Sequence, residues 1–416
     1  MNKVWQTRLT QQFPPTIPII GAPMAGVSGA HLAFATTKTG ALGSIAAGHY
    51  VTDNSAHNLD LEVQEYYRLF DHNGHKTTSA TTEATQPPLM VGFICHSTFN
   101  SEEGWNRVEN FMKRYKPQVV QYFSPALVAK KQTTPLTTTT TTTTVDDASF
   151  NNNIELAHKY GCKVMAQVGT EEEARKVLDA GTDCIIAQGT EAGGHGCRYD
   201  VGSGTLALAS RIVTLVRGNT EEKKKNIPVL AAGGIVNGRG LAAALALGCD
   251  GIVLGTRLWA SSEAKGAEWK KQKLADANVG PDQVIRTTVM DKVQNSFSKT
   301  PWPEPFDSSG VLRNEMTDMW HGREKELDQA LQCKTRKRNK TGVDEKGGDE
   351  DNDEKEEENE VVVQFKNESF IYAGKGVGDI SSITSAHDII QQIEKEAFDI
   401  IQSLPQMVLV DKGDNS

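Results

Sequence analysis

The chain lacks any apolar run approaching the roughly 20 residues that a membrane-spanning helix requires. Its first residues, Met1–Leu9, have no apolar core of signal-peptide length, and the final residues, Lys412–Ser416, are not a peroxisomal address. Hydrophobic residues make up 38% of the 416 residues, which is enough for one large core and an appendage. We therefore expect a soluble cytoplasmic protein with no membrane partner.

Cysteine is sparse, and no two cysteines form a Cys-x-x-Cys pair. The six are Cys95, Cys162, Cys184, Cys197, Cys249 and Cys333. Structural zinc sites and disulfide frameworks depend on closely spaced cysteines. We therefore expect reduced cysteines that mostly pack in the core, and no metal site.

Clustered positive charge is missing from most of the chain. The formal net charge is -9, but Asp344–Glu360 alone has eleven acidic residues and two Lys, which already gives -9. The remainder is close to neutral, whereas a nucleic-acid-binding surface needs clustered Lys and Arg. We therefore expect no nucleic-acid partner.

Two segments differ from ordinary globular sequence. The first is almost entirely Thr, and it predicts a disordered surface loop over about residues 131–150. The second, Lys334–Glu360, joins the basic cluster Lys334–Lys340 to the acidic run. The basic cluster is typical of a nuclear-import patch or of one half of a self-neutralising disordered loop, and the second interpretation is favoured.

Short apolar runs recur through the rest of the chain, each followed by a segment with helical spacing. The runs are Ile17–Ile20, Ala41–Ile45, Leu89–Ile94, Val119–Phe123, Lys163–Gln167, Cys184–Ala187, Val229–Ala232 and Gly251–Leu254. Continuous apolar runs of this length are typical of strands buried on both faces of a parallel sheet. Eight alternating units favour an α/β fold of the (β/α)8 TIM-barrel type.

The same pattern predicts the domain boundaries. Residues 1–263 form the barrel, and residues 264–331 form an inserted, mainly helical substrate or lid domain. Residues 332–361 are the disordered charged insert, and residues 362–416 return to the barrel. The apolar spacing within Ser382–Leu404 predicts the final helix.

The loop after the sixth run is the most informative segment for function. Gln188–Gly196 is polar and glycine-rich, and it presents a single imidazole, His195. Active sites of such barrels lie at the C-terminal ends of the strands. Because histidine titrates near neutral pH, His195 can act as a general base there. A lone histidine is more often structural, and the loop alone leaves both interpretations open.

Three further loops have the small residues that let a flat ligand approach the backbone. Ala22, Pro23 and Met24 follow the first run, although a tight turn explains them equally well. Gly233 and Gly234 follow the seventh run, and Val253–Thr256 (Val253, Leu254, Gly255 and Thr256) end the eighth. Barrels often bind one phosphate with the loops after the last two strands, and a single phosphate is typical of FMN. The chain has no Walker-type loop, and the Gly374–Gly378 pattern is too short to predict a dinucleotide fold.

These segments together resemble the nitronate monooxygenase family, in its fungal-type form. The matching pieces are Pro18–Met24, Gln188–His195, Pro228–Ile235 with Asn237–Gly240, Gly251–Thr256 and Tyr372–Gly378. The resemblance covers about residues 15 to 400, apart from the inserts. It implies an FMN-bound barrel that oxidises nitronates, and some nitroalkanes, with O2 to carbonyl compounds and nitrite.

The resemblance also implies roles for single residues. Gln188 and Gly193 are expected to contact the flavin, with Met24 near the ring, and Gly234, Gly255 and Thr256 are expected to hold the phosphate. The further expected cofactor-binding residues are Ala22, Pro23, Gly194, Gly233, Val253 and Leu254. His195 is expected to take the α-proton of a nitroalkane.

The sequence departs from the family pattern in two places. Bacterial-type members have an Asn that contacts FMN after the third strand, whereas this chain has Val91–His96. After the eighth strand, Val253–Thr256 replaces the common Gln-Met-Gly-Thr. Both departures leave the substrate open.

Two other functions remain open at this stage. FMN-dependent enoyl-acyl-carrier-protein reductases share the Glu-Ala-Gly-Gly-His loop, and related barrels are NAD(P)H:quinone reductases. A flavin-binding or scaffold protein without catalysis is the third interpretation, and the complete His195 loop counts against it. The substrate, the use of NAD(P)H, the oligomeric state and the role of the inserts are not predicted.

Overall fold

A computed structural model describes residues 4–72, 86–130, 150–338, 360–367 and 370–404. The Thr-rich tract and residues 339–359 of the charged insert lie outside these ranges, so their predicted disorder stays a prediction. Among the described residues, no helix combines the length and the apolar character needed to cross a membrane.

Eight parallel strands form the central sheet, in the order β1-β9-β8-β6-β5-β4-β3-β2. They are β1 (Ile19–Gly21), β2 (Ile45–Gly48), β3 (Met90–Ile94), β4 (Val119–Phe123), β5 (Lys163–Val168), β6 (Cys184–Gln188), β8 (Val229–Ala232) and β9 (Gly251–Leu254). β1 also meets Leu42, just before β2: the Gly21 N–H donates to the Leu42 carbonyl at 2.9 Å. This contact closes the sheet, and the predicted (β/α)8 barrel is confirmed.

Side chains alternate between the inside and the outside of the barrel along each strand. Ile20, Leu42, Met90, Met165 and Ile186 belong to the inner cluster, which Leu9 and Phe13 from the region of α1 (Arg8–Gln12) complete. Their neighbours along the strands face the surrounding helices. This double burial explains why the strands read as continuous apolar runs.

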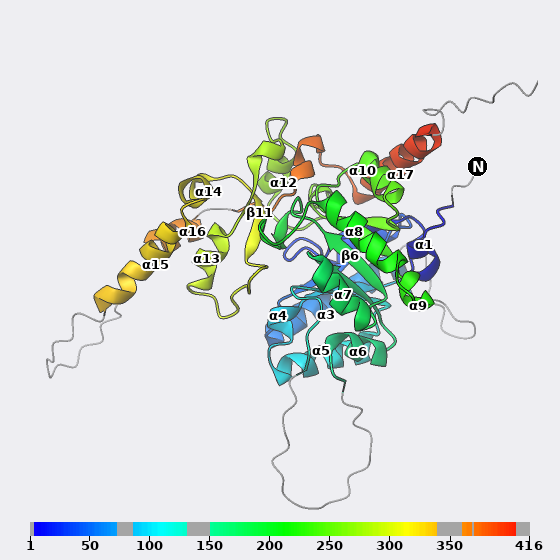
Figure 1. The fold of residues 1–416 in the computed structure, drawn as a ribbon, viewed down its shortest axis with the longest axis horizontal. Coiled ribbons are helices and arrows are strands. Elements are labelled where there is room, and N and C mark those ends of the chain that lie inside the picture. The colour runs from blue at the N-terminus through cyan, green and yellow to red at the C-terminus, as the bar shows by residue number, and fades with distance from the viewer. Residues whose placement is uncertain (1–3, 73–85, 131–149, 339–359, 368–369, 405–416) are drawn as a thin grey trace, which may run out of the picture.

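The helices cover the barrel from outside, as the ribbon shows (Figure 1). They are α2 (Ala30–Thr37), α3 (Asp53–His72), α4 (Cys95–Thr98), α5 (Glu102–Tyr115), α6 (Asn153–Lys159), α7 (Glu171–Asp179), α8 (Thr205–Arg217), α9 (Glu222–Lys225), α10 (Gly238–Ala246) and α17 (Ala386–Ser403). α17 is the predicted final helix, and it packs against α10 and α2. Thr170 caps α7 by accepting the Glu173 N–H, as its sequence predicts.

The inserted unit follows the eighth barrel strand and extends to one side of the barrel (Figure 1). α11 (Thr256–Trp259) directly follows β9, and its Leu258 and Trp259 belong to the same buried cluster as the barrel residues. The helices of the inserted unit are α12 (Glu268–Leu274), η1 (Pro281–Gln283), α13 (Val289–Asn295), α14 (Glu315–Trp320), α15 (Glu324–Arg338) and α16 (Glu360–Asn367). Residues 332–338 thus continue a helix, and α16 begins at 360, so both ends of the predicted charged insert are helical. The chain then passes through η2 (Lys375–Asp379) to α17.

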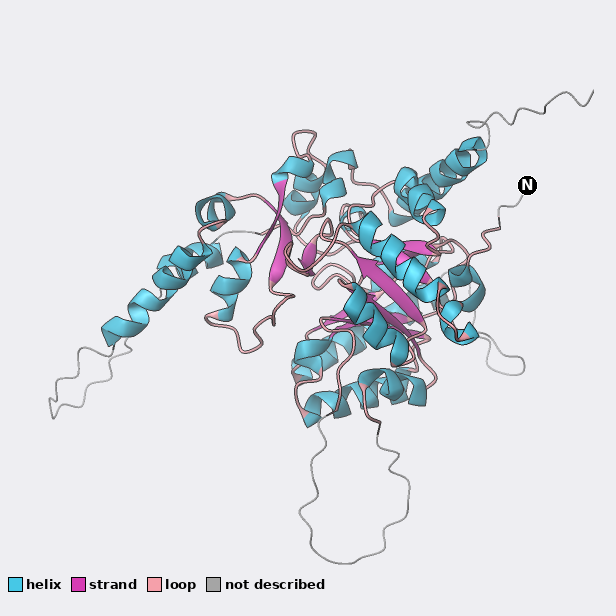
Figure 2. Cartoon of the chain, viewed as in Figure 1, coloured by secondary structure: helices cyan, strands magenta, loops and turns pink. Residues whose placement is uncertain are grey.

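A small antiparallel sheet joins this unit to the barrel (Figure 2). Its order is β10 (Val284–Thr287), β11 (Ser308–Leu312) and β7 (Gly194–Gly196). These strands have no apolar run that would predict them, because β11 begins Ser-Ser-Gly and β7 is Gly-His-Gly. Since β7 contains His195, the inserted unit determines where that histidine lies.

The five cysteines whose side chains are described, Cys95, Cys162, Cys184, Cys197 and Cys249, are buried and free. Burial raises the pKa of each thiol. In the described part of the chain, no three His, Cys, Asp or Glu side chains gather as a metal site would require.

Candidate active site

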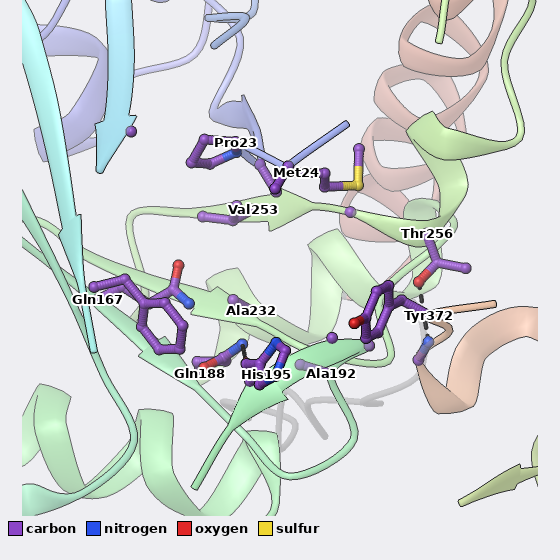
Figure 3. A pocket seen from close by; sticks show the side chains of 18 of the residues that line it. Pro23, Met24, Gln167, Gln188, Ala192, His195, Ala232, Val253, Thr256 and Tyr372 are labelled. Atoms are coloured by element: carbon purple, nitrogen blue, oxygen red, sulfur yellow. Dashed lines mark hydrogen bonds between the residues drawn. The ribbon is translucent and has the colours of Figure 1, made fainter. Parts of the chain in front are cut away.

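A cavity of about 290 Å³ opens at the C-terminal ends of the barrel strands. Figure 3 shows Pro23, Met24 and Val253 on one side of it and Gln188 and His195 on the other. Thr256 lies at one end and Gln167 toward the opposite end. The loops after several different strands therefore converge on one elongated space.

The structure brings the predicted site residues together around this cavity, with one exception. Ala22, Pro23, Met24, Gln188, Gly193, Gly194, His195, Gly233, Gly234, Val253, Gly255 and Thr256 all line it. Leu254 does not: it is fully buried in the cluster between the barrel and the helices, whereas its neighbour Val253 faces inward. The alternation of side chains along a strand accounts for the difference.

The His195 ring is held on several sides by the inserted unit. Its backbone pairs with Ser309 of β11, and its Nε2 lies 2.6 Å from Oδ1 of Asp291, on α13. Its ring stacks on Trp302, with centroids 3.6 Å apart and planes 7° apart. Only 13% of the His195 side chain stays exposed, so the imidazole is fixed rather than free to rotate.

Asp291 is fully buried behind His195 and bonds to two side chains. Its other carboxylate oxygen, Oδ2, accepts the Ser309 hydroxyl at 3.1 Å. Burial, with the charge of Asp291 added, raises the pKa of Tyr372 above its ordinary value. The sequence offered no signal for Asp291, because nothing near it in the chain relates it to His195.

A buried guanidinium lies behind the glycine-rich loop. Arg286, on β10, donates to the carbonyls of Thr190 at 3.0 Å, Ala192 at 2.7 Å and Ser308 at 2.9 Å. Burial lowers the pKa of Arg286 to about 10, so it stays protonated at neutral pH. Because these carbonyls are held by Arg286, the loop is fixed from the side away from the cavity.

Glutamines gather at the end of the cavity away from Thr256. The Gln188 side-chain amide donates to the His195 backbone carbonyl at 3.0 Å, and the Gln121 side-chain amide donates to Oε1 of the Gln167 side chain at 2.6 Å. The Oε1 atoms of Gln188 and Gln121 are buried and have no hydrogen-bond partner among the described residues. Of these three glutamines, only Gln188 was expected from the sequence; a polar residue inside an apolar strand run was the available signal for the other two.

Two more histidines lie close to Trp302, and neither was expected from the sequence as a site residue. His49 lines the cavity and its ring lies 5.5 Å from Trp302, while the His96 ring lies 4.7 Å from it. Burial, and then the nearby His195, lowers the pKa of His49. Burial is also the main reason that the pKa of His96 falls to about 4. Each follows a barrel strand, as His195 does, and that placement was the signal.

The opposite end of the cavity is built from glycine loops. Gly233 and Gly234 have φ of 120° and 69°, a conformation that favours glycine. The first N–H groups of a helix have no partner within it, and at α11 the cap residue Gly255 has no side chain to accept from them. The Gly374 N–H donates to the Thr256 hydroxyl oxygen at 3.0 Å (Figure 3). The segment around Gly374 therefore completes this cavity.

The lining of the cavity is nearly free of formal charge. Its ionisable side chains are His49, His195 and Tyr372, and it contains no Lys, Arg, Asp or Glu among the described residues. A space with apolar walls and a few amide and imidazole groups fits a flat, largely neutral heterocycle better than a highly charged ligand.

The chain is similar to several known proteins. The family profile described as nitronate monooxygenase matches residues 6–295. The chain is 29% identical to a nitronate monooxygenase of Neurospora crassa over 75% of this chain and 78% of that protein. It is 31% identical to one of Pseudomonas aeruginosa over 60% of this chain and 68% of that protein.

Two solved structures share the fold. FabK from Thermotoga maritima has a TM-score of 0.62 at 22% identity, and the match covers 97% of this chain and 99% of the FabK chain. A nitroalkane oxidase from Streptomyces ansochromogenes has a TM-score of 0.60 at 21% identity, and the match covers 95% of this chain and 99% of the oxidase chain. At these identities the likeness concerns the architecture.

Proposed function

Because this chain belongs to the nitronate monooxygenase family, we propose that it uses FMN and O2 to oxidise nitronates to carbonyl compounds and nitrite. In this proposal it also accepts nitroalkanes, from which His195 removes the α-proton. The observation that carries the proposal is the position of His195 in the cavity, fixed by Asp291 and Trp302 and surrounded by the predicted glycine loops.

The residues of the cavity fit FMN at both ends. The uncapped start of α11 at Gly255 and Thr256, together with Gly234, would hold the phosphate through N–H groups. The unpartnered Oε1 atoms of Gln188 and Gln121 are acceptors available to the polar edge of the ring. Met24 would lie against the ring. The bound flavin would supply the redox chemistry, taking electrons from the nitronate and returning them to O2.

The protein's own groups would prepare the substrate. His195 would accept the α-proton of a nitroalkane, which leaves the anionic nitronate. Trp302, with Phe123 and Phe306 packed close to it, would keep water away from this step. No acidic side chain lines the described cavity, so no carboxylate would face the anion directly.

The test uses the purified full-length protein. We expect a yellow protein from which acid releases FMN, and O2 uptake with ethylnitronate in the absence of NAD(P)H. Anaerobic mixing with ethylnitronate should bleach the flavin, whereas NADH alone should not. A colourless protein that FMN cannot reconstitute, or a flavin that reacts with NADH but not with the nitronate, would contradict the proposal.

A further inference from the structure

We propose that Asp291 is a positioning residue that sets the tautomer of His195, so that Nδ1 receives the substrate proton. The inference rests on the proposed function, since it refines the base that the function requires. It names which nitrogen of the imidazole reacts and which residue of the inserted unit makes that nitrogen available.

The hydrogen bond between the two side chains determines the tautomer. An ionised carboxylate can only accept, so the Nε2 atom that lies 2.6 Å from Asp291 Oδ1 must carry the hydrogen. In a neutral imidazole the second nitrogen is then an acceptor. Among the described residues Nδ1 has no hydrogen-bond partner, and the His195 side chain lines the cavity. The lone pair that can take a proton is therefore on Nδ1.

The surroundings hold the Asp291 carboxylate in place. Its second oxygen accepts the Ser309 hydroxyl at 3.1 Å, and Ser309 is the residue that pairs with His195 across the small sheet. The buried cation Arg286 interacts electrostatically with Asp291. The Tyr372 phenol also interacts with Asp291, which contributes to the raised pKa of that phenol. The carboxylate is thus bonded on both oxygens and has a cation near it.

The arrangement also stabilises the state that proton transfer produces. The α-carbon–hydrogen bond of the nitroalkane breaks, its electron pair stays on the substrate as the nitronate, and the proton bonds to Nδ1. His195 then becomes an imidazolium, which the Asp291 carboxylate neutralises and the face of Trp302 attracts. A preformed nitronate needs no such step and gains nothing from Asp291.

The experiment compares nitroethane with preformed ethylnitronate in the FMN-loaded wild type and in Asp291→Asn. We expect kcat/KM for nitroethane to fall by about 10² or more, the scale of a misaligned or uncharged general base. For ethylnitronate we expect a change within about threefold, with unchanged FMN content. Asp328→Asn is the matched control, because it removes a carboxylate from the same unit at the partly exposed Lys292 pair, away from His195.

A second measurement does not depend on the folding of any variant. Nitrogen NMR of the wild-type holoenzyme labelled at histidine should report a protonated Nε2 and an unprotonated Nδ1 for His195. A protonated Nδ1 would overturn the inference, as would equal losses on both substrates in Asp291→Asn. If His195→Asn selectively loses nitroethane turnover while Asp291→Asn does not, only this inference fails. If His195→Asn shows no such selectivity, the proposed function fails in its deprotonation step, whereas a flavin that does not react with ethylnitronate would contradict the proposed oxidation itself.

Discussion

Trp302 and His195 lie face to face, with ring centroids 3.6 Å apart and planes 7° apart. The Trp302 backbone is held in turn by Asn295, whose side-chain oxygen accepts its N–H at 3.0 Å. A residue from the inserted unit thus forms one wall of the space around a barrel-loop histidine. This contact relates the inserted unit directly to the size of the substrate that the cavity accepts.

Shortening Trp302 should change substrate size selectivity. Trp302→Ala removes the indole between His195 and His49, which enlarges the cavity. We expect the ratio of kcat/KM for 1-nitrohexane to that for nitroethane to rise by about tenfold. This factor corresponds to the free energy of burying roughly two methylene groups. Trp302→Phe keeps an aromatic ring and should change the ratio much less. An unchanged ratio in Trp302→Ala would show that Trp302 does not limit the substrate.

Replacing His195 should separate proton abstraction from oxidation. His195→Asn keeps a polar side chain on β7 but has no basic nitrogen. We expect turnover of neutral nitroalkanes to fall by about 10² or more, and turnover of preformed nitronates to fall far less. Stopped-flow flavin reduction with both substrates measures this difference. Equal loss on the two substrates would contradict the role of His195 as the base.

Much of this site could be predicted from sequence because the barrel strands and their loops are local features. Each apolar run is buried on both faces, and the glycine loops follow directly at the strand ends. Leu254 shows the limit of that reasoning, since strand alternation turns it outward while Val253 faces the cavity. Because side chains alternate between the two faces of a strand, these adjacent residues point in opposite directions.

The partners of His195 could not be predicted in the same way. Asp291, Arg286 and Trp302 all come from the inserted unit, far along the chain from the loop they hold. Their positions depend on the pairing of β7 with β11, and neither strand has an apolar run. Non-local pairing of short polar strands leaves no periodic pattern to detect.

Arg286 should be essential to the stability of the glycine-rich loop. Arg286→Met leaves the buried carbonyls of Thr190, Ala192 and Ser308 without their donor. We expect a loss of about 3 kcal/mol or more in unfolding free energy and weaker FMN binding. Arg313→Met is the control, since that residue pairs with Asp318 at the surface, and it should cost about 1 kcal/mol or less. Urea unfolding and FMN titration measure both, and similar losses in the two variants would contradict this account.

Gly193 should tolerate no side chain. An added Cβ would lie 2.6 Å from the Ala373 carbonyl carbon and 2.7 Å from the Gly374 nitrogen, so the backbone of that segment would have to move. Movement there would break the bond from Gly374 to Thr256 at the proposed phosphate end. We expect Gly193→Ala to raise the Kd for FMN by about tenfold or more. This factor corresponds to the free energy of one lost hydrogen bond to a charged group. Gly280→Ala, where nothing lies within 4 Å, should leave the Kd unchanged.

His96 should make the protein less stable in mild acid. Burial lowers its folded pKa from 6.5 to about 4, so below pH 6.5 the unfolded chain binds a proton that the folded chain resists. The stability that His96 contributes is complete above pH 6.5 and is lost as the pH falls toward 4. We expect urea unfolding to show His96→Gln losing less stability than wild type between pH 7 and pH 4.5, by up to about 2 kcal/mol. His387 is exposed, so His387→Gln should lose as much unfolding free energy as the wild type over this pH range. If His96→Gln also loses as much unfolding free energy as the wild type, the buried neutral imidazole is not the source of the acid sensitivity.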